Sequence, residues 1–294
     1  MTLYSIDQFS QITGLNKILI RTWENRYNFL TPKRSSTNIR TYDDEMLNKG
    51  IKYALLVDNG FKISKLVSLN NKNLNNLLEE TLEKSKDKNV KYNIYISKFL
   101  EAALTLNQEI FEKTYNRCLK KLGIINFYKE ILIKTMYKIS ILYLNYEITS
   151  ANEHFLSENI RIKLANKIDK IKSNTQNSKK WILFLPENEY HDIGLLFTYL
   201  LLKKNNQNVI YLGQNTTRES LLKINNNNNN NNNNFLFFLN TKRTKEFSEK
   251  ICQFLSVNLS KSKIYVIENE QLLMKKYDNI ISLKSIDNFI DIIK

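Results

Sequence analysis

The sequence predicts a multidomain protein of the α and α/β classes: a winged helix-turn-helix domain, a central four-helix bundle and a C-terminal five-stranded parallel sheet. Three observations predict this order. A cluster of cations lies between helix signals near the N-terminus, the middle of the chain keeps helical apolar spacing without proline, and short apolar strands alternate with helices from Lys180 onward. The chain has 294 residues, 42% of them hydrophobic, which is enough to bury more than one core.

The first helix is expected to begin after Ser5, with Gln8 as its capping-box partner, and to end at Gly14. Asn16 can cap a second helix. Three apolar side chains are expected to pack inward from it: Ile18, Leu19 and Trp23. Its polar face would carry Lys17, Arg21 and Asn25.

After the second helix, the chain turns at Pro32 into a basic, hydroxyl-rich ribbon that ends at Arg40, which indicates a two-stranded wing. Acids at 43–45 open a third helix, expected from 43 to 58. A Leu-Val-rich segment at 64–68 completes this domain, and the Asn/Lys-rich stretch 70–76 is expected to be a linker.

The helix and ribbon carry an excess of positive charge. Between Leu15 and Arg40 there are six cations and one acid, Glu24. Lysine and arginine neutralise backbone phosphates, and neighbouring Ser, Thr and Asn side chains add neutral hydrogen bonds. A solvated basic face is the alternative interpretation. The whole chain, with a formal charge of +15 and a pI near 9.5, also favours a polyanionic partner.

Three motifs follow one another here: Arg-x-Trp-Glu-x-Arg-Tyr at 21–27, Pro-x-Arg at 32–34, and Arg-x-Tyr with acids after it at 40–45. This segment resembles the DNA-binding domain of the MerR family of bacterial transcription regulators. The resemblance implies a recognition helix in the major groove, a wing on the flanking backbone, and a dimer on a pseudo-palindromic operator. The residues it predicts to contact DNA are Lys17, Arg21, Thr22, Arg26, Lys33, Arg34, Ser35 and Arg40. Lys17 and Thr22 would reach base edges, whereas Trp23 and Tyr27 would form the core.

The middle of the chain, 77–172, has no proline and one glycine, Gly123, and is expected to fold as a bundle of about four helices. On its own this pattern also fits a spacer or a dimerisation unit. Tyr143 and the pair Glu153 and His154 resemble the Trp and Glu-His of the helical cap in the cobalamin-binding regulators of the CarH and LitR group. These three residues are therefore cofactor-binding candidates. Leu144 replaces the histidine of the light-sensing members, which argues against photochemical switching.

From Lys180 the alternation of strands and helices predicts a five-stranded doubly wound sheet of the Rossmann-like, flavodoxin-like type. The expected strands are 181–185, 208–212, 235–239, 263–267 and one beginning at Ile280. Ligands of such sheets bind beyond the carboxyl ends of the strands.

The loop after the first of these strands resembles the Asp-x-His-x-x-Gly motif of cobalamin-binding domains through Glu189, His191 and Gly194. In that motif the histidine is the lower ligand to cobalt, the acid orients it, and the glycine lets the corrin tail approach. His191 is therefore the metal-ligand candidate. A lone histidine in a loop is otherwise more often structural.

Three features depart from the cobalamin-binding pattern. Asn240, Thr241 and Lys242 replace the residues expected after the third strand, and Glu268 and Asn269 replace a Gly-Gly after the fourth. A run of asparagines at 225–234 is expected to be a flexible surface insertion, with self-association as the weaker alternative.

Together these features predict three domains: a DNA-binding domain (1–72), a cap-like helical bundle (77–172) and a cobalamin-binding-like domain (178–294). The leading hypothesis is a transcription regulator whose sensor domain, with cobalamin as the possible cofactor, controls oligomerisation and operator binding. The alternative is a regulator whose sensor domain has lost its ligand and serves as an interaction platform. A cobalamin-dependent enzyme is disfavoured, because no substrate-handling domain or catalytic constellation is found.

The remaining expectations concern redox state and location. Cys118 and Cys252 have no CxxC partners, so neither a disulfide framework nor a zinc site is expected. The sequence shows no signal-peptide pattern and no long apolar run. We therefore expect a cytoplasmic protein that forms a dimer or higher oligomer and does not contact a membrane.

Overall fold

The computed structural model describes residues 3–34, 38–144, 148–172, 180–227, 233–239, 245–268 and 275–293. The chain divides into two compact units, Met1–Glu158 and Asn159–Lys294. Within the described residues, no helix is long and apolar enough to span a membrane.

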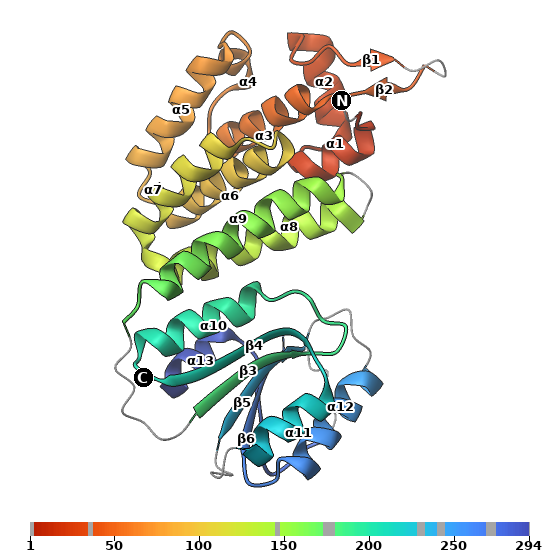
Figure 1. Ribbon diagram of the computed structural model, residues 1–294. Helices are drawn as coiled ribbons and strands as arrows, with labels where there is room; N and C mark the ends of the chain where they lie inside the picture. The colour runs from red at the N-terminus through yellow and green to blue at the C-terminus, as the bar shows by residue number, and fades with distance from the viewer. Residues whose placement is uncertain are drawn as a thin grey trace. The chain divides into compact units, whose positions relative to one another are not determined.

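The N-terminal part of the first unit has the predicted order of helices and wing (Figure 1). Its elements are α1 (Ile6–Thr13), α2 (Lys17–Tyr27), β1 (Lys33–Arg34), β2 (Arg40–Thr41), α3 (Asp44–Asp58) and α4 (Ile63–Leu66). The predicted capping box between Ser5 and Gln8 is present, and Gly14 ends α1 with a φ of 77°, a left-handed conformation that glycine adopts without strain. The side chain of Asn16 caps α2 by accepting from the amide of Ile18. The predicted starts of α1 and α2 are thus confirmed.

The stretch 70–76, predicted to be a linker, is instead the beginning of a helix, α5 (Asn71–Lys84). The Asn70 side chain caps it by accepting from the amide of Asn73. Leu74, Leu78 and Leu82 recur every fourth residue and are buried. The linker prediction was wrong because the asparagine-rich composition obscured this apolar stripe.

The bundle continues with α6 (Lys88–Leu104), α7 (Gln108–Asn126), the π-helical turn η1 (Phe127–Leu132), α8 (Ile133–Leu144) and α9 (Ser150–Asp169). Phe99 lies in the core of the bundle. Its ring centroid is 5.6 Å from that of Phe111 and 5.8 Å from that of Phe127. Gly123 has a φ of 72°, which breaks the helical course of α7 near its end. The boundary between the two units falls within α9.

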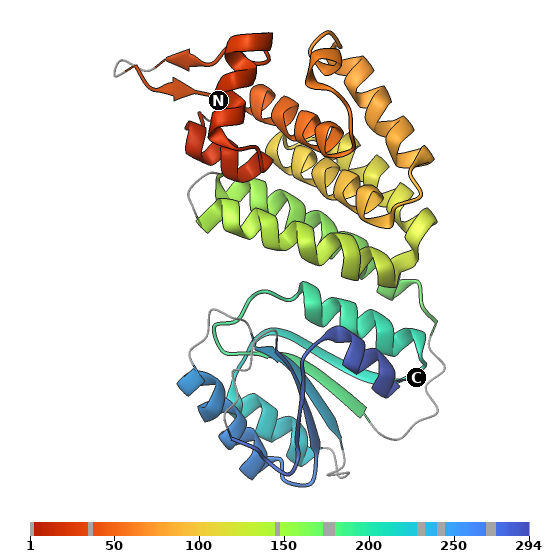
Figure 2. The same ribbon diagram turned by 180° about the vertical axis from the view of Figure 1, so that it is seen from behind.

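The second unit is a parallel sheet with the strand order β4-β3-β5-β6-β7, which is the predicted doubly wound arrangement. The strands are β3 (Lys180–Pro186), β4 (Asn208–Thr216), β5 (Asn234–Leu239), β6 (Lys263–Glu268) and β7 (Ile280–Leu283). Its helices are α10 (Ile193–Lys204), α11 (Arg218–Asn227), α12 (Lys245–Asn258) and α13 (Ile286–Ile293). Figure 1 and Figure 2 show α10 and α13 on one face of the sheet and α11 and α12 on the other.

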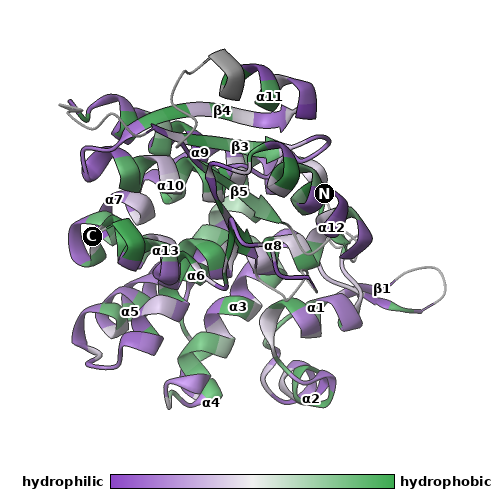
Figure 3. Cartoon of the chain, turned by 90° about the horizontal axis from the view of Figure 1, so that it is seen from below, coloured by the Kyte–Doolittle hydropathy of each residue, from purple (hydrophilic) through white to green (hydrophobic). Residues whose placement is uncertain are grey.

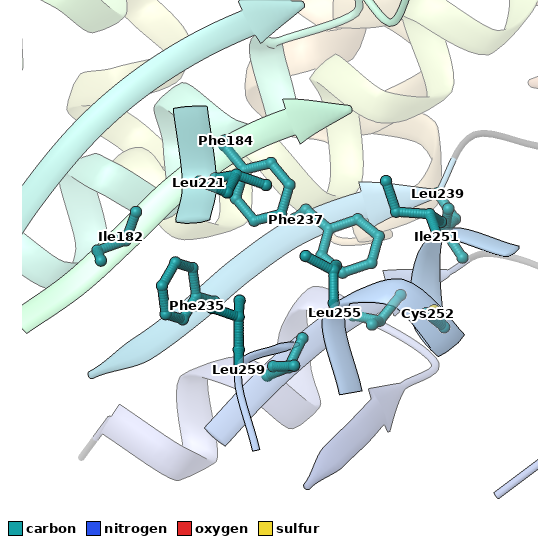
Figure 4. Close-up of a cluster of buried hydrophobic side chains, with 12 residues drawn as sticks. Ile182, Phe184, Leu221, Phe235, Phe237, Leu239, Ile251, Cys252, Leu255 and Leu259 are labelled. Atoms are coloured by element: carbon teal, nitrogen blue, oxygen red, sulfur yellow. The ribbon is translucent and has the colours of Figure 1, made fainter. Parts of the chain in front are cut away.

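A compact apolar core joins the sheet to α11 and α12 (Figure 4). Phe184 and Phe237, from neighbouring strands, stack with ring centroids 5.2 Å apart. Leu221 of α11 and Leu255 of α12 are completely buried against them. The central strand β5 is hydrophobic along most of its length, as its green colour in Figure 3 shows.

Both ends of the asparagine run belong to regular structure. Helix α11, which the sequence did not predict, extends to Asn227, and Asn234 begins β5. Asn233 and Asn234 are buried. The expectation of a surface insertion is therefore wrong for these two residues, while 228–232 lie outside the described residues.

Candidate nucleic-acid interface and a histidine loop

The second helix, α2, presents a cationic face to solvent. Lys17, Arg21, Thr22 and Arg26 are exposed, whereas Ile20 and Trp23 are buried. The Thr22 hydroxyl donates a 2.8 Å hydrogen bond to the Ile18 carbonyl, so its proton is used within the helix. These four predicted DNA contacts thus lie on one helix and face water.

Two of the three apolar side chains expected to pack inward from α2 do not. Ile18 is 74% exposed and Leu19 is 37% exposed. The inward positions are Ile20, Trp23 and Glu24, which follow helical spacing. The expectation for Ile18 and Leu19 was wrong because three consecutive apolar residues cannot all face one side of a helix.

Trp23 is confirmed as a core residue, since it is buried and its ring meets Phe29 edge-on at 5.5 Å. Tyr27 is only half-buried, and the Arg26 guanidinium lies 5.7 Å from its ring centroid. Lys17 forms an ion pair with Asp7 of α1, but both side chains are more than half exposed. An ion pair this exposed is weak, so it leaves Lys17 available to a phosphate or a base.

A buried carboxylate connects α2 to the wing. Glu24 accepts a 3.0 Å hydrogen bond from Arg40 Nε and a 2.6 Å hydrogen bond from the Tyr42 hydroxyl. Burial and the bond to Glu24 raise the pKa of Tyr42 above its ordinary value, so its hydroxyl stays protonated at neutral pH. Arg40, predicted to contact DNA, is therefore half-buried and has a structural partner.

The wing exposes two further cations. Lys33 pairs with Thr41 and Arg34 with Arg40 across the antiparallel β1-β2 ladder, and Lys33 and Arg34 are exposed. Arg34 Nη1 donates a 2.8 Å hydrogen bond to the Asn38 side chain, which shapes the wing near its tip. The predicted DNA contact Ser35 lies outside the described residues.

The second unit holds the predicted loop with His191. It comprises residues 187–192, directly after β3, and we call it the histidine loop. His191 Nδ1 lies 2.6 Å from Glu189 Oε1, which also accepts from the backbone amides of Tyr190 and His191. Burial opposes ionisation of Glu189, but these hydrogen bonds outweigh it and hold the pKa of the carboxyl below its ordinary value. Because Glu189 is then ionised, Nδ1 donates to it. The imidazole, 61% exposed, is held in one orientation.

Asp192, the next residue, is fixed by groups that the sequence did not single out. It is buried and pairs with Arg161 of α9, at 3.0 Å between Oδ1 and Nε and 3.1 Å between Oδ2 and Nη2. The Tyr211 hydroxyl donates to Oδ2 at 3.3 Å. These contacts come from α9 and β4, so they pin the end of the histidine loop, and only the folded chain reveals them.

Gly194, at the start of α10, lies against an aromatic ring. A Cβ atom at this position would be 2.8 Å from Phe238 Cε1, which is closer than real contacts allow. The glycine is thus required by the packing of α10 on Phe238 of β5. In the motif that this loop resembles, the glycine lets the corrin tail approach.

The other predicted cofactor residues lie in the first unit, on α8 and α9. Tyr143 is 43% exposed. The His154 side chain is 69% exposed, and its Nε2 lies 3.7 Å from Glu153 Oε2. In the second unit, Glu268 is buried and accepts a hydrogen bond from the Ser282 hydroxyl. Asn240, Thr241, Lys242 and Asn269 lie outside the described residues.

Comparisons with known proteins find helix-turn-helix regulators of transcription. Residues 4–69 match the family model described as MerR HTH family regulatory protein. The HTH-type transcriptional repressor CarH of Myxococcus xanthus is 26% identical over 220 residues, which cover 74% of this chain and 73% of CarH. The HTH-type transcriptional regulator MlrA of Escherichia coli (strain K12) is 29% identical over 75 residues, which cover 25% of this chain and 31% of MlrA.

Among solved structures, a monomethylamine corrinoid protein of Methanosarcina barkeri matches with a TM-score of 0.55 at 12% identity, covering 66% of this chain and 94% of that one. At this identity the match shows the fold alone. The predicted resemblance to MerR-type regulators and the predicted fold class are confirmed. Both sequence relatives are regulators of transcription, which supports a regulator and not an enzyme.

Proposed function

We propose that this protein, whose N-terminal segment matches the MerR regulator model, is a transcription regulator that binds a double-stranded DNA operator. The observation that carries the proposal is that exposed cations lie on two elements that Glu24 joins: Lys17, Arg21 and Arg26 on α2, and Lys33 and Arg34 on the wing. A helix flanked by a basic ribbon is suited to a major groove and its adjoining backbone. We expect a dimer to bind two half-sites.

Within this surface the cations have different roles. Arg21, Arg26, Lys33 and Arg34 are exposed and would hold backbone phosphates. Lys17, the first residue of α2, and Thr22, at the middle of the helix, would approach base edges. Arg40 would act mainly through Glu24, by holding the wing against α2.

For the C-terminal domain, we propose that the histidine loop is the site of a corrinoid, with His191 as its lower ligand. The donor set fits this role, because an ionised Glu189 binds Nδ1 and orients the ring, as the acid of the motif does for its histidine. A bound cobalamin would supply a cobalt ion that can accept an imidazole nitrogen, and His191 would hold it. By resemblance, Tyr143, Glu153 and His154 are candidates for its upper side. Ligand binding would change the oligomeric state and thereby the affinity for DNA.

One observation favours the second candidate, a platform without a ligand. The ring of Phe238 lies against Gly194, the position at which, by resemblance, a corrin tail would approach. In this candidate, the ring excludes the tail. In this second candidate, the C-terminal domain keeps the fold of a cobalamin-binding domain but binds no cobalamin. The regulator would then respond to a protein partner, or it would assemble constitutively.

The first experiment tests DNA binding by selecting operator sequences from a random duplex library with the full chain and footprinting the product. The second mixes the full chain with adenosyl-, methyl- and hydroxocobalamin in the dark, removes free ligand by gel filtration and records the absorption spectrum. A corrin spectrum that is lost in His191→Ala would support the corrinoid site, whereas no retained colour with any form would support the platform. A chain that protects no duplex would contradict the regulator itself.

A further inference from the structure

The most exposed large apolar side chain among the described residues is Ile18, and it lies within the cationic face of α2. It is 74% exposed, whereas Ile20 is completely buried. Packing therefore does not explain an isoleucine at this position, since the core takes Ile20 and Trp23 instead. The cations of α2 can bind a charged ligand. An exposed apolar side chain among them can then contact an apolar group of the same ligand.

Ile18 lies in the first turn of α2. It is the second residue of α2, and its amide donates to the Asn16 cap at 2.8 Å, which fixes the first turn. In helix-turn-helix proteins, the N-terminal residues of the recognition helix contact base edges.

The polar neighbours of Ile18 are partly engaged within the protein. The Thr22 hydroxyl, one turn on, donates to the Ile18 carbonyl, and Lys17 pairs with Asp7. A hydrogen bond from Thr22 to a base would therefore compete with one inside the helix. Apolar contact is what this turn offers most directly.

We propose that Ile18 reads the 5-methyl group of a thymine in the major groove of the operator. Thymine carries a methyl group on its major-groove edge, and apolar side chains recognise it by contact. The inference rests on the proposed function, because it requires DNA on α2. It assigns sequence readout to a residue that the motif, which is rich in arginine, does not emphasise.

The test begins by selecting duplexes from a random library with the full chain, with and without hydroxocobalamin, and repeating the selection with Ile18→Ala. In the selected duplex, each thymine is then replaced in turn by deoxyuridine, which removes only the methyl group. At one thymine in each half-site, we expect deoxyuridine to weaken wild-type binding about fourfold, the effect of one buried methyl group. The same replacement should leave Ile18→Ala unaffected.

Two variants serve as controls. Ile18→Val should keep the deoxyuridine effect because it keeps a branched apolar side chain. Ile162→Ala, at an isoleucine that is 64% exposed in the other unit, should behave as wild type. The proposal is overturned if deoxyuridine at every thymine leaves wild-type affinity unchanged, or if it weakens binding by Ile18→Ala to the same degree. Selection of no sequence at all would overturn DNA binding as well, so the two failures are distinguishable.

Discussion

The Tyr42 hydroxyl donates a 2.6 Å hydrogen bond to Glu24 Oε1, while Arg40 Nε donates to Oε2 of the same carboxylate at 3.0 Å. Glu24 lies on α2, Arg40 lies on the second strand of the wing, and Tyr42 follows that strand. One buried acid thus joins the two elements proposed to contact DNA. Glu24, the single acid between Leu15 and Arg40, therefore holds the wing against α2 through these two hydrogen bonds.

Replacing Glu24 by Ala should strongly destabilise the N-terminal domain, because it leaves Arg40 and Tyr42 without their shared acceptor. We expect a decrease of about 3 to 5 kcal/mol in the free energy of unfolding, the range for removing one partner of a buried pair. Urea denaturation followed by Trp23 fluorescence, in a Trp181→Phe background with no other tryptophan, would measure it.

Glu80→Ala is the matched control, since Glu80 pairs with Lys84 on the exposed surface of α5. Its effect on the free energy of unfolding should stay below about 0.5 kcal/mol. A Glu24→Ala variant as stable as this control would show that Glu24 does not fasten the wing.

The salt dependence of DNA binding should separate cations that contact phosphates from Arg40. For Arg21→Ala, Arg26→Ala or Arg34→Ala, the slope of log affinity against log salt concentration should become shallower by about one for each phosphate that the variant no longer neutralises. Arg40→Ala should chiefly lower stability, because its guanidinium is bound to Glu24. Filter binding on a selected duplex across a salt series is the measurement.

Lys84→Ala, an exposed cation on α5, should leave the slope unchanged. An Arg40→Ala variant of full stability with a shallower slope would instead place Arg40 on a phosphate. Unchanged slopes for all three arginine variants would contradict the proposed surface.

The parts of this structure that local signals specify could be predicted from the sequence. Ser5, Asn16 and Gly14 act through neighbours a few residues away, so the ends of α1 and the start of α2 were predictable. The strands of the second unit could be predicted because each is a short apolar run between polar loops. Asparagine-rich segments misled the prediction, since Asn70 is a helix cap and Asn234 is part of β5.

The candidate sites were predicted less completely, because their decisive contacts are distant in sequence. Glu24 meets Arg40 and Tyr42 only when the wing folds back on α2. Phe238 reaches Gly194 from a different strand. The exposure of Ile18 could not be predicted either, because a run of three apolar residues does not reveal which one faces the core.

Removing one partner of a second buried ion pair should destabilise the first unit. Lys52 of α3 donates a 2.9 Å hydrogen bond to Glu101 of α6, which also accepts from Asn48 at 3.0 Å, and both charged side chains are largely buried. Glu101→Ala would leave the Lys52 ammonium without its acid, so we expect a decrease of about 3 to 5 kcal/mol in the free energy of unfolding. The same Trp23 fluorescence assay would record it.

The double variant Lys52→Met with Glu101→Leu should recover most of this stability, because two apolar side chains can replace a buried ion pair. A double variant as unstable as Glu101→Ala would mean that packing, and not the unpaired charge, sets the cost. Glu109→Ala, at an exposed position of α7, would check that removing a glutamate from the bundle is not itself destabilising.

The last prediction concerns Phe238, whose ring fills the space beside Gly194. If this ring limits entry of a corrinoid, Phe238→Ala should increase the cobalamin retained after gel filtration, by roughly tenfold if the wild type spends about 1.4 kcal/mol moving the ring. The added retention should disappear when His191→Ala is introduced as well, because the lower ligand is then missing. Absorption of the gel-filtered protein at the corrin bands is the measurement.

Phe254→Ala provides the matched control, because Phe254 is a half-buried phenylalanine of α12 in the same unit and lies under Arg218. It should not increase retention. A separate check of the geometry is Gly194→Ala, which should cost about 1 to 3 kcal/mol through overpacking in the wild type and less in the Phe238→Ala background. If the stability effects appear but neither phenylalanine variant retains cobalamin, Phe238 packs as described and the domain acts without a corrinoid. Such a result would favour the interaction platform.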